Sequence, residues 1–124
     1  MRRVSRKNAK IVVFEWDDGV NFSHPPIPEE LEKVFQAKIQ LVHQKGGDRY
    51  IGRKLYHLLS SAGWINIEIK LVHDIWQGPE NRAKYLRGTK LSLKEIRPQL
   101  IENHLITEME FDLAMKQLYR LLLW

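Results

Sequence analysis

The sequence contains no cysteine and no long apolar run. Without cysteine, the chain cannot form disulfides, use a thiolate nucleophile or hold a metal through thiolate ligands. No stretch approaches the roughly 20 apolar residues that span a bilayer, and the N-terminus lacks the apolar core of a signal peptide. These absences exclude disulfide scaffolds and cysteine-ligated zinc sites, and they predict a cytoplasmic protein with no membrane partner.

The seven glycines form no phosphate-binding loop. Gly46 and Gly47 are adjacent, but they follow a predicted helix and not a strand. A loop that binds a dinucleotide needs glycines between a strand and a helix, where the backbone can approach the phosphates. We therefore interpret the pair as a helix stop, and we expect no cofactor to bind this chain alone.

The histidines show no spacing typical of metal ligands. His43, His57, His73 and His104 are scattered over different predicted elements. Metal sites usually combine ligands whose spacing brings them to one face of a helix or one loop. No metal site is proposed from the sequence.

The net charge is +5, from 20 Lys and Arg against 15 Asp and Glu. Part of the excess lies near the N-terminus, at Arg2, Arg3, Arg6, Lys7 and Lys10. A basic segment without interleaved aromatic residues is more typical of a solvated surface than of a groove that follows phosphates. Nucleic acid is therefore not the expected partner, and an RNA-associated protein is the last of the functions considered.

Two segments have the composition of β-strands. Residues 10–16 form a β-branched and aromatic run without alternation, which predicts a strand covered on both faces within a parallel sheet. Residues 64–73 alternate between apolar and polar side chains, which predicts a half-exposed strand near a sheet edge. The first strand should end at Asp17, Asp18 and Gly19.

The remaining segments predict helices. One amphipathic helix should start at Pro28 and end before Gly46, and a second should run from Asp48 to Gly63. After Gly78, a helical annex over residues 79–124 carries two capping-box spacings and a proline that should kink or split it: Ser92 with Glu95, Thr107 with Glu110, and Pro98. The order predicts one α/β domain over residues 1–124, with its α/β part at 1–73.

The order of these segments resembles the C-terminal part of class I S-adenosylmethionine-dependent methyltransferases, in their UbiE-like small-molecule branch. Met1 to Val4 with Lys10 to Gly19 is similar to the end of a helix and the fifth strand of that family. The stretch from Gly46 to Leu55, continued by Leu58 to Trp64, is similar to the helix before the sixth strand. Residues 99–107 also look like the segment that follows it. The resemblance implies a partial Rossmann-like sheet with its two main strands near 10–16 and 64–73.

The family's glycine-rich turn and ribose-binding acid lie upstream of the matched region. The resemblance therefore implies a fragment that uses S-adenosylmethionine only within an intact parent and helps to bind its small-molecule methyl acceptor. Exposed sheet edges would then pair with a second copy or with the missing N-terminal half. The alternative is a degenerate methyltransferase-like interaction or regulatory subunit.

Candidate substrate-binding residues gather after the first predicted strand, where open α/β sheets place their ligands: Glu15, Trp16, Asp17, Asp18, Phe22 and His24. A carboxylate there could orient or deprotonate a methyl acceptor, whereas the aromatic residues and His24 could line its pocket. In the alternative, Asp17 and Asp18 only turn the chain, and the loop packs on its own helix. Asp48 is expected to cap a helix, and Arg53 to pair with it or cover apolar surface.

Overall fold

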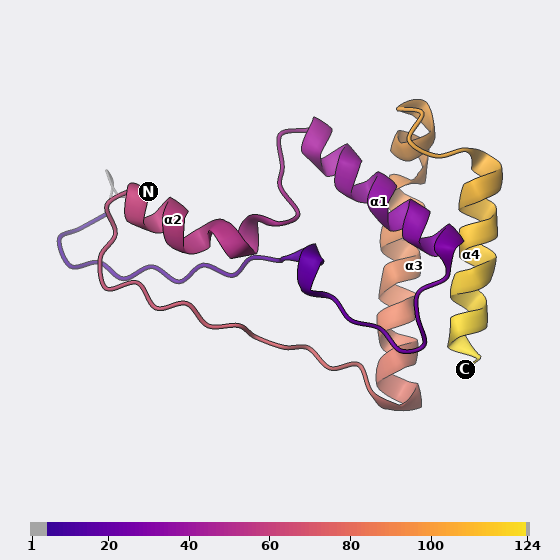
Figure 1. Cartoon of the computed structure of the whole chain (residues 1–124), viewed down its shortest axis with the longest axis horizontal. Coiled ribbons are helices and arrows are strands. Elements are labelled where there is room, and N and C mark those ends of the chain that lie inside the picture. Colours follow the sequence, from indigo (N-terminus) through magenta and orange to yellow (C-terminus); the bar gives the residue numbers. More distant parts are fainter. Residues whose placement is uncertain (1–4, 124) are drawn as a thin grey trace. The chain divides into compact units, whose positions relative to one another are not determined.

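The computed structural model describes residues 5–123, shown in Figure 1. Over that range its regular elements are all helical: η2 (Asp18–Val20), α1 (Glu29–Gln44), η3 (Ile51–Lys54), α2 (Leu55–Ser61), α3 (Gly78–Glu102) and α4 (Glu108–Leu122). No strand occurs within residues 5–123. The predicted α/β fold with a partial Rossmann-like methyltransferase sheet is therefore wrong.

The chain divides into two compact units. Unit 1 comprises Met1–Asn21 and Asp48–His73, and unit 2 comprises Phe22–Gly47 and Asp74–Trp124. Met1 to Val4, which contribute to the resemblance and include the basic Arg2 and Arg3, lie outside the described residues, as does Trp124. Each unit is described below by itself.

In unit 1, the two predicted strands run without regular structure (Figure 1). We call residues 10–16 the first extended segment and residues 64–73 the second extended segment. Within the described chain their backbones make only two hydrogen bonds to other backbone groups, one from Gly52 N to the Trp16 carbonyl and one from Trp64 N to the Leu59 carbonyl. A strand needs a neighbour that supplies a ladder of hydrogen bonds, and neither segment has one. The sheet was predicted from the side-chain pattern alone, which does not show whether a neighbouring strand is present.

The second predicted helix is present in unit 1 as η3 followed by α2. Gly63 ends it with a positive φ of 84°. The Trp64 N–H donates to the Leu59 carbonyl at 3.0 Å, and the Gly63 N–H donates to the Ser60 carbonyl at 2.9 Å. These bonds satisfy carbonyls that the helix end leaves free, and the left-handed conformation they require favours glycine.

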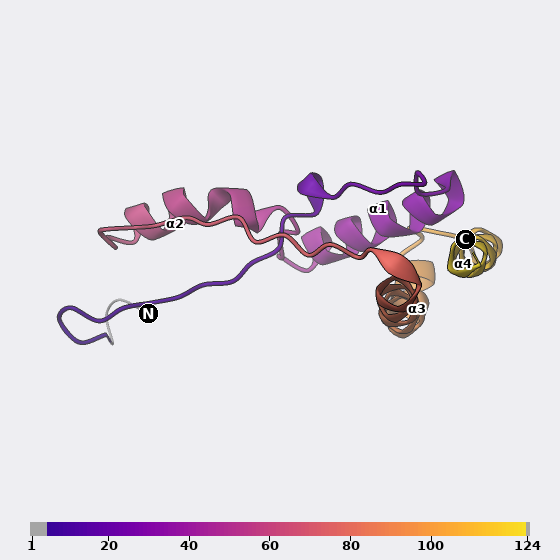
Figure 2. The same cartoon turned by 90° about the horizontal axis from the view of Figure 1, so that it is seen from below.

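In unit 2, α1 crosses the antiparallel pair of α3 and α4, which are seen nearly end-on in Figure 2. Pro28 is the N-cap of α1, and three glutamates in its first turn complement the helix dipole. The predicted apolar stripe is confirmed at Leu31, Val34 and Leu41, which are buried. Gly46, with φ of 80°, follows the helix end as predicted.

The helical annex is confirmed, with two corrections. Thr107 and Glu110 form the predicted capping box at the start of α4. The second predicted capping box is wrong, because Ser92 and Glu95 both lie inside α3. Pro98 was predicted to kink or split the annex; the split is wrong, since α3 continues through Pro98 to Glu102, and the kink stays a prediction. Packing on α1 and α4 outweighs the backbone hydrogen bond that a proline cannot donate.

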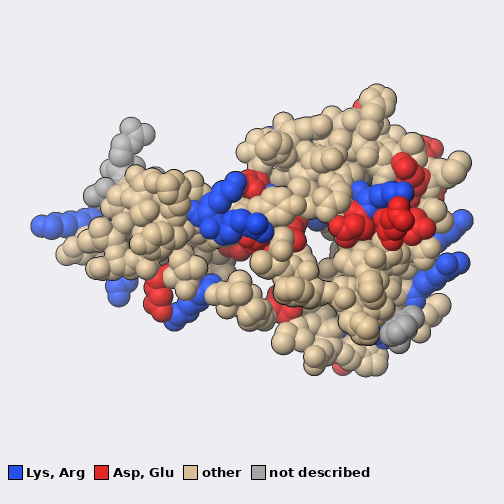
Figure 3. Space-filling view, in the orientation of Figure 1, with Lys and Arg blue, Asp and Glu red and all other residues tan. Residues whose placement is uncertain are grey.

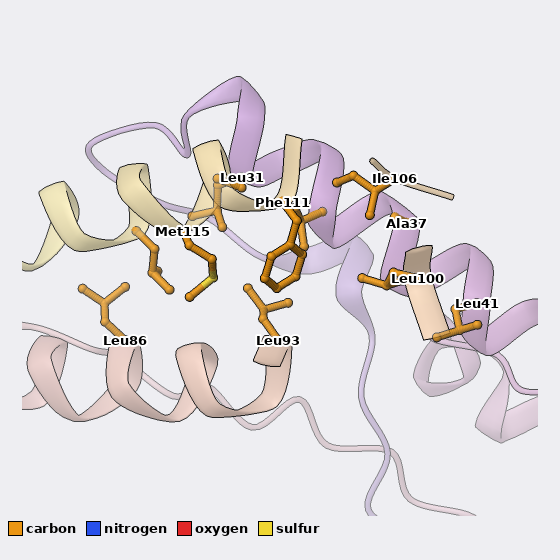
Figure 4. Close-up of a cluster of buried hydrophobic side chains, with 12 residues drawn as sticks. Leu31, Ala37, Leu41, Leu86, Leu93, Leu100, Ile106, Phe111 and Met115 are labelled. Carbon is orange, nitrogen blue, oxygen red and sulfur yellow. The ribbon is translucent and has the colours of Figure 1, made fainter. Parts of the chain in front are cut away.

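The hydrophobic core of the described chain lies in unit 2. Figure 4 shows Phe111 of α4 between side chains of α1 and α3. Its ring is 2% exposed, and Leu31, Leu93 and Leu100 are at most 1% exposed. Unit 2 therefore has the interior of a small three-helix domain.

Candidate functional site

Two ion pairs join the end of the first extended segment to the start of η3 in unit 1. Arg53 donates from Nε to Asp17 Oδ2 at 2.7 Å and from Nη2 to Asp17 Oδ1 at 2.6 Å. Arg49 donates from Nε to Asp18 Oδ2 at 2.7 Å and from Nη2 to Asp18 Oδ1 at 2.8 Å. Both pairs use the two parallel bonds that the guanidinium and carboxylate geometries match best. We call these four residues the aspartate–arginine clamp.

Backbone contacts hold the clamp in register. The Asp18 N–H donates to the Arg49 carbonyl at 3.0 Å, and the Gly52 N–H donates to the Trp16 carbonyl at 3.1 Å. A Cβ at position 52 would lie 3.0 Å from the Trp16 oxygen, closer than most such contacts. This close approach of the two backbones therefore favours glycine at position 52.

The clamp stabilises the charged form of Asp17. The hydrogen bonds from Arg53 lower the pKa of Asp17 to about 2, and the Gly19 N–H bond adds to this effect. The same contact raises the pKa of Arg53. A carboxylate with such a low pKa is a poor proton acceptor near neutral pH. In unit 1, Asp17 therefore has a structural role. Its role in substrate binding stays a prediction.

The other candidate residues are largely exposed. Trp16 is 66% exposed in unit 1, and Glu15 beside it is exposed. Phe22 and His24 belong to unit 2, where Phe22 is 97% exposed and His24 is exposed. Phe22 does not pack on α1, whereas Ile27 of the same loop packs against the core of unit 2. The substrate pocket predicted from these residues stays a prediction.

Apolar side chains of the extended segments face solvent. Val12 is 81% and Phe14 is 79% exposed in the first segment. The second segment exposes four large apolar residues: Ile65, Ile69, Leu71 and Val72. Single exposed apolar residues are common, but runs of them on unpaired backbone mark surfaces that bind another molecule.

The partner of Arg53 differs from the predicted Asp48, the alternative prediction being that Arg53 covers apolar surface, and no role was predicted for Arg49. Arg53 pairs with Asp17, and Asp48 instead accepts hydrogen bonds from the Tyr50 N–H at 2.8 Å and Lys54 Nζ at 2.6 Å. The two arginines could have been identified from their spacing, because residues four positions apart lie near one side of a helical turn. Their acidic partners lie 31 and 36 residues away in sequence, where local patterns carry no information.

Two further properties concern the described part of the chain only. Residues 5–123 contain no group of three or more His, Asp or Glu side chains placed to hold a metal ion. None of the helices in that range combines the length and apolar character needed to cross a membrane.

No protein family, curated protein or solved structure matches this chain. The resemblance to methyltransferases therefore stays a prediction based on the motifs quoted above.

Proposed function

We propose that this chain is a binding subunit whose extended segments add as strands to those of another polypeptide. The observation that carries the proposal is the exposure of strand-forming residues on backbone that makes almost no internal hydrogen bonds. Strand addition would give the unpaired N–H and C=O groups their partners and would cover the adjacent apolar side chains.

The aspartate–arginine clamp supports this proposal, because it presents the first extended segment in a defined way. The clamp and the Gly52–Trp16 bond anchor the carboxyl end of that segment on η3. An anchored segment loses less conformational entropy on binding than a free one. Residues 10–15 keep their backbone groups available for a partner, since within the described chain none of them bonds to another backbone group.

A second, more specific proposal is that the partner is the cofactor-binding portion of a UbiE-like methyltransferase. It is favoured by one observation: the clamp joins two of the motifs that carry the resemblance, residues 10–19 and residues 46–55. In this proposal the chain supplies the acceptor side of the enzyme, and the partner binds S-adenosylmethionine. The chain alone neither binds the methyl donor nor catalyses transfer.

Self-association tests the first proposal, with a second copy of the chain as the probe. We expect the molecular mass from light scattering and the β-signal in infrared spectra to rise together with concentration. Phe14→Lys should suppress both, because it places a charge within the segment. The matched control is Met109→Lys, which changes an equally exposed residue of α4 (81% exposed) and should have no effect. Strand addition is refuted if the chain stays monomeric, with no β-signal at millimolar concentration, and also fails to bind the methyltransferase half described next.

Titration calorimetry tests the second proposal. S-adenosylhomocysteine should give no heat with the chain alone, and micromolar binding would contradict the proposal. The cofactor-binding half of a UbiE-like enzyme, cut before its fifth strand, should bind the chain and lose that binding with Phe14→Lys. If self-association is observed and this half does not bind, the methyltransferase proposal fails while strand addition stands.

A further inference from the structure

Unit 2 concentrates positive charge on α3. Between residues 82 and 97 this helix contains a single acidic residue, Glu95, and six basic ones: Arg82, Lys84, Arg87, Lys90, Lys94 and Arg97. Acidic side chains gather instead around a shallow groove in unit 2 lined by Glu29, Glu32 and Glu110, and Figure 3 shows acidic side chains over the start of α1. Lys33 also lines that groove and pairs with Glu29, but acidic residues outnumber basic ones there.

Four of the basic residues form one face of α3. Arg87, Lys90, Lys94 and Arg97 are spaced by three or four residues, so they follow one another along one side of the helix for about 15 Å. Their side chains border the buried row of Leu86, Leu93 and Leu100, which packs in the core. We call these four residues the basic face.

An aromatic ring of α4 lies against the basic face. Lys90 Nζ is 4.5 Å from the centroid of the Tyr119 ring, which remains 44% exposed. A hydrogen bond from Lys90, together with the charges of Lys90 and Lys94, lowers the pKa of Tyr119. Tyr119 thus contacts Lys90 of the basic face, with part of its surface open to solvent.

Little acidic charge offsets the basic face. Arg97 Nη2 lies 3.6 Å from Asp112 Oδ1, which is the one ion pair of this face within the described residues. Arg87, Lys90 and Lys94 form no ion pair with an acid there, although Arg87 bonds to the carbonyl of Ala83. Three adjacent cations therefore lack an acidic partner within the described residues, and one of them, Lys90, also contacts Tyr119.

We propose that the basic face binds the phosphate backbone of single-stranded nucleic acid and that Tyr119 stacks on an unpaired base. A row of cations with an aromatic ring at its margin is the combination by which proteins hold single strands without reading their sequence. The basic segment near the N-terminus lacks such a ring within the described residues. This activity is separate from strand addition, because it uses residues of unit 2 alone.

Two other anionic partners fit the face less well. A membrane-bound helix needs an apolar side to insert, and the main apolar row of α3 is buried in the core. A protein interface is depleted of lysine at its centre and contains packed apolar anchors. The basic face offers one exposed apolar neighbour on α3, Leu91, which is 64% exposed.

Fluorescence anisotropy with a labelled 20-nucleotide oligouridylate tests the proposal. We expect binding at 50 mM salt with a log–log salt slope of about −2 to −3, which corresponds to three or four phosphates on a single strand. Arg87→Glu combined with Lys94→Glu should lower the affinity about tenfold or more and reduce the slope. Tyr119→Ala should weaken binding several-fold with the slope kept, whereas Tyr119→Phe should not.

The matched control reverses the same number of charges in unit 1, with Arg6→Glu and Lys10→Glu. It should leave the affinity nearly unchanged, and circular dichroism should show that both double variants keep their helices. The proposal is overturned if no binding occurs at 50 mM salt, or if the unit 1 control removes binding and the α3 variant does not. Equal competition by polyglutamate would show a general polyanion surface and would also overturn it.

Discussion

Unit 1 and unit 2 are built from similar proportions of apolar residues but are stabilised differently. All twelve buried hydrophobic residues of the described chain lie in unit 2, on α1, α3, α4 and the turn before α4. The described part of unit 1 buries no side chain to that degree and is held by the aspartate–arginine clamp and a few backbone bonds. Partly exposed ion pairs of this kind contribute little to stability by comparison with core burial.

The difference follows from how helices and strands satisfy their backbones. A helix forms its backbone hydrogen bonds within itself, so α1, α3 and α4 need only one another to bury their apolar stripes. A strand depends on a neighbour for the same bonds. The extended segments have strand-forming side chains without that neighbour. Unit 1 therefore exposes apolar side chains on backbone that lacks a hydrogen-bonded ladder.

The largest difference in stability between the two units should come from replacing a phenylalanine by alanine in each. Phe111→Ala should lower the free energy of unfolding by about 3–5 kcal/mol, because it leaves a cavity in the core of unit 2. Phe14→Ala should change it by less than about 0.5 kcal/mol, because that ring is 79% exposed. Urea denaturation followed by circular dichroism measures both. A comparable loss for Phe14→Ala would show that unit 1 has an interior of its own.

Replacing a glycine by alanine should destabilise unit 1 and stabilise unit 2. Gly52→Ala should weaken the clamp, since the new Cβ would meet the Trp16 carbonyl oxygen at 3.0 Å. Hydrogen exchange at the Asp18 amide, which bonds to the Arg49 carbonyl, should then accelerate. Gly88→Ala in α3 meets nothing within 4 Å and should stabilise unit 2 by about 0.5–1 kcal/mol through helix propensity. Unchanged exchange in the first variant would mean that the two backbones separate without cost to the clamp.

Local signals predicted the elements of unit 2 well. The stripe of α1 and the capping box of α4 depend on residues three or four positions apart, and both are found as expected. The sheet and the partner of Arg53 depend on residues far apart in the sequence. Residues 10–16 have the side chains of a buried strand, but a sheet also requires neighbours that a local pattern cannot supply.

The capping box offers a smaller test in unit 2. The Glu110 N–H donates to Thr107 Oγ1 at 3.2 Å, and the Thr107 N–H donates to Glu110 Oε2 at 2.9 Å. Thr107→Ala should lower the free energy of unfolding by about 1 kcal/mol, because it leaves an N–H of the first turn without its cap. Thr107→Ser, which keeps the hydroxyl, is the control and should recover most of the loss in a urea titration.

Acid should weaken the aspartate–arginine clamp of unit 1. The folded pKa of Asp17, about 2, lies below its ordinary value of 3.8, so the carboxylate form is the one that the clamp stabilises. Its contribution is therefore complete above pH ~4 and is lost as the pH falls towards ~2. The NMR signal of the Arg53 Nε–H should shift with a midpoint near pH 2, and Asp17→Asn should remove the transition. A midpoint near 3.8 would show that the ion pair with Arg53 does not persist in solution, and unit 1 would then lose the contact that anchors its first extended segment.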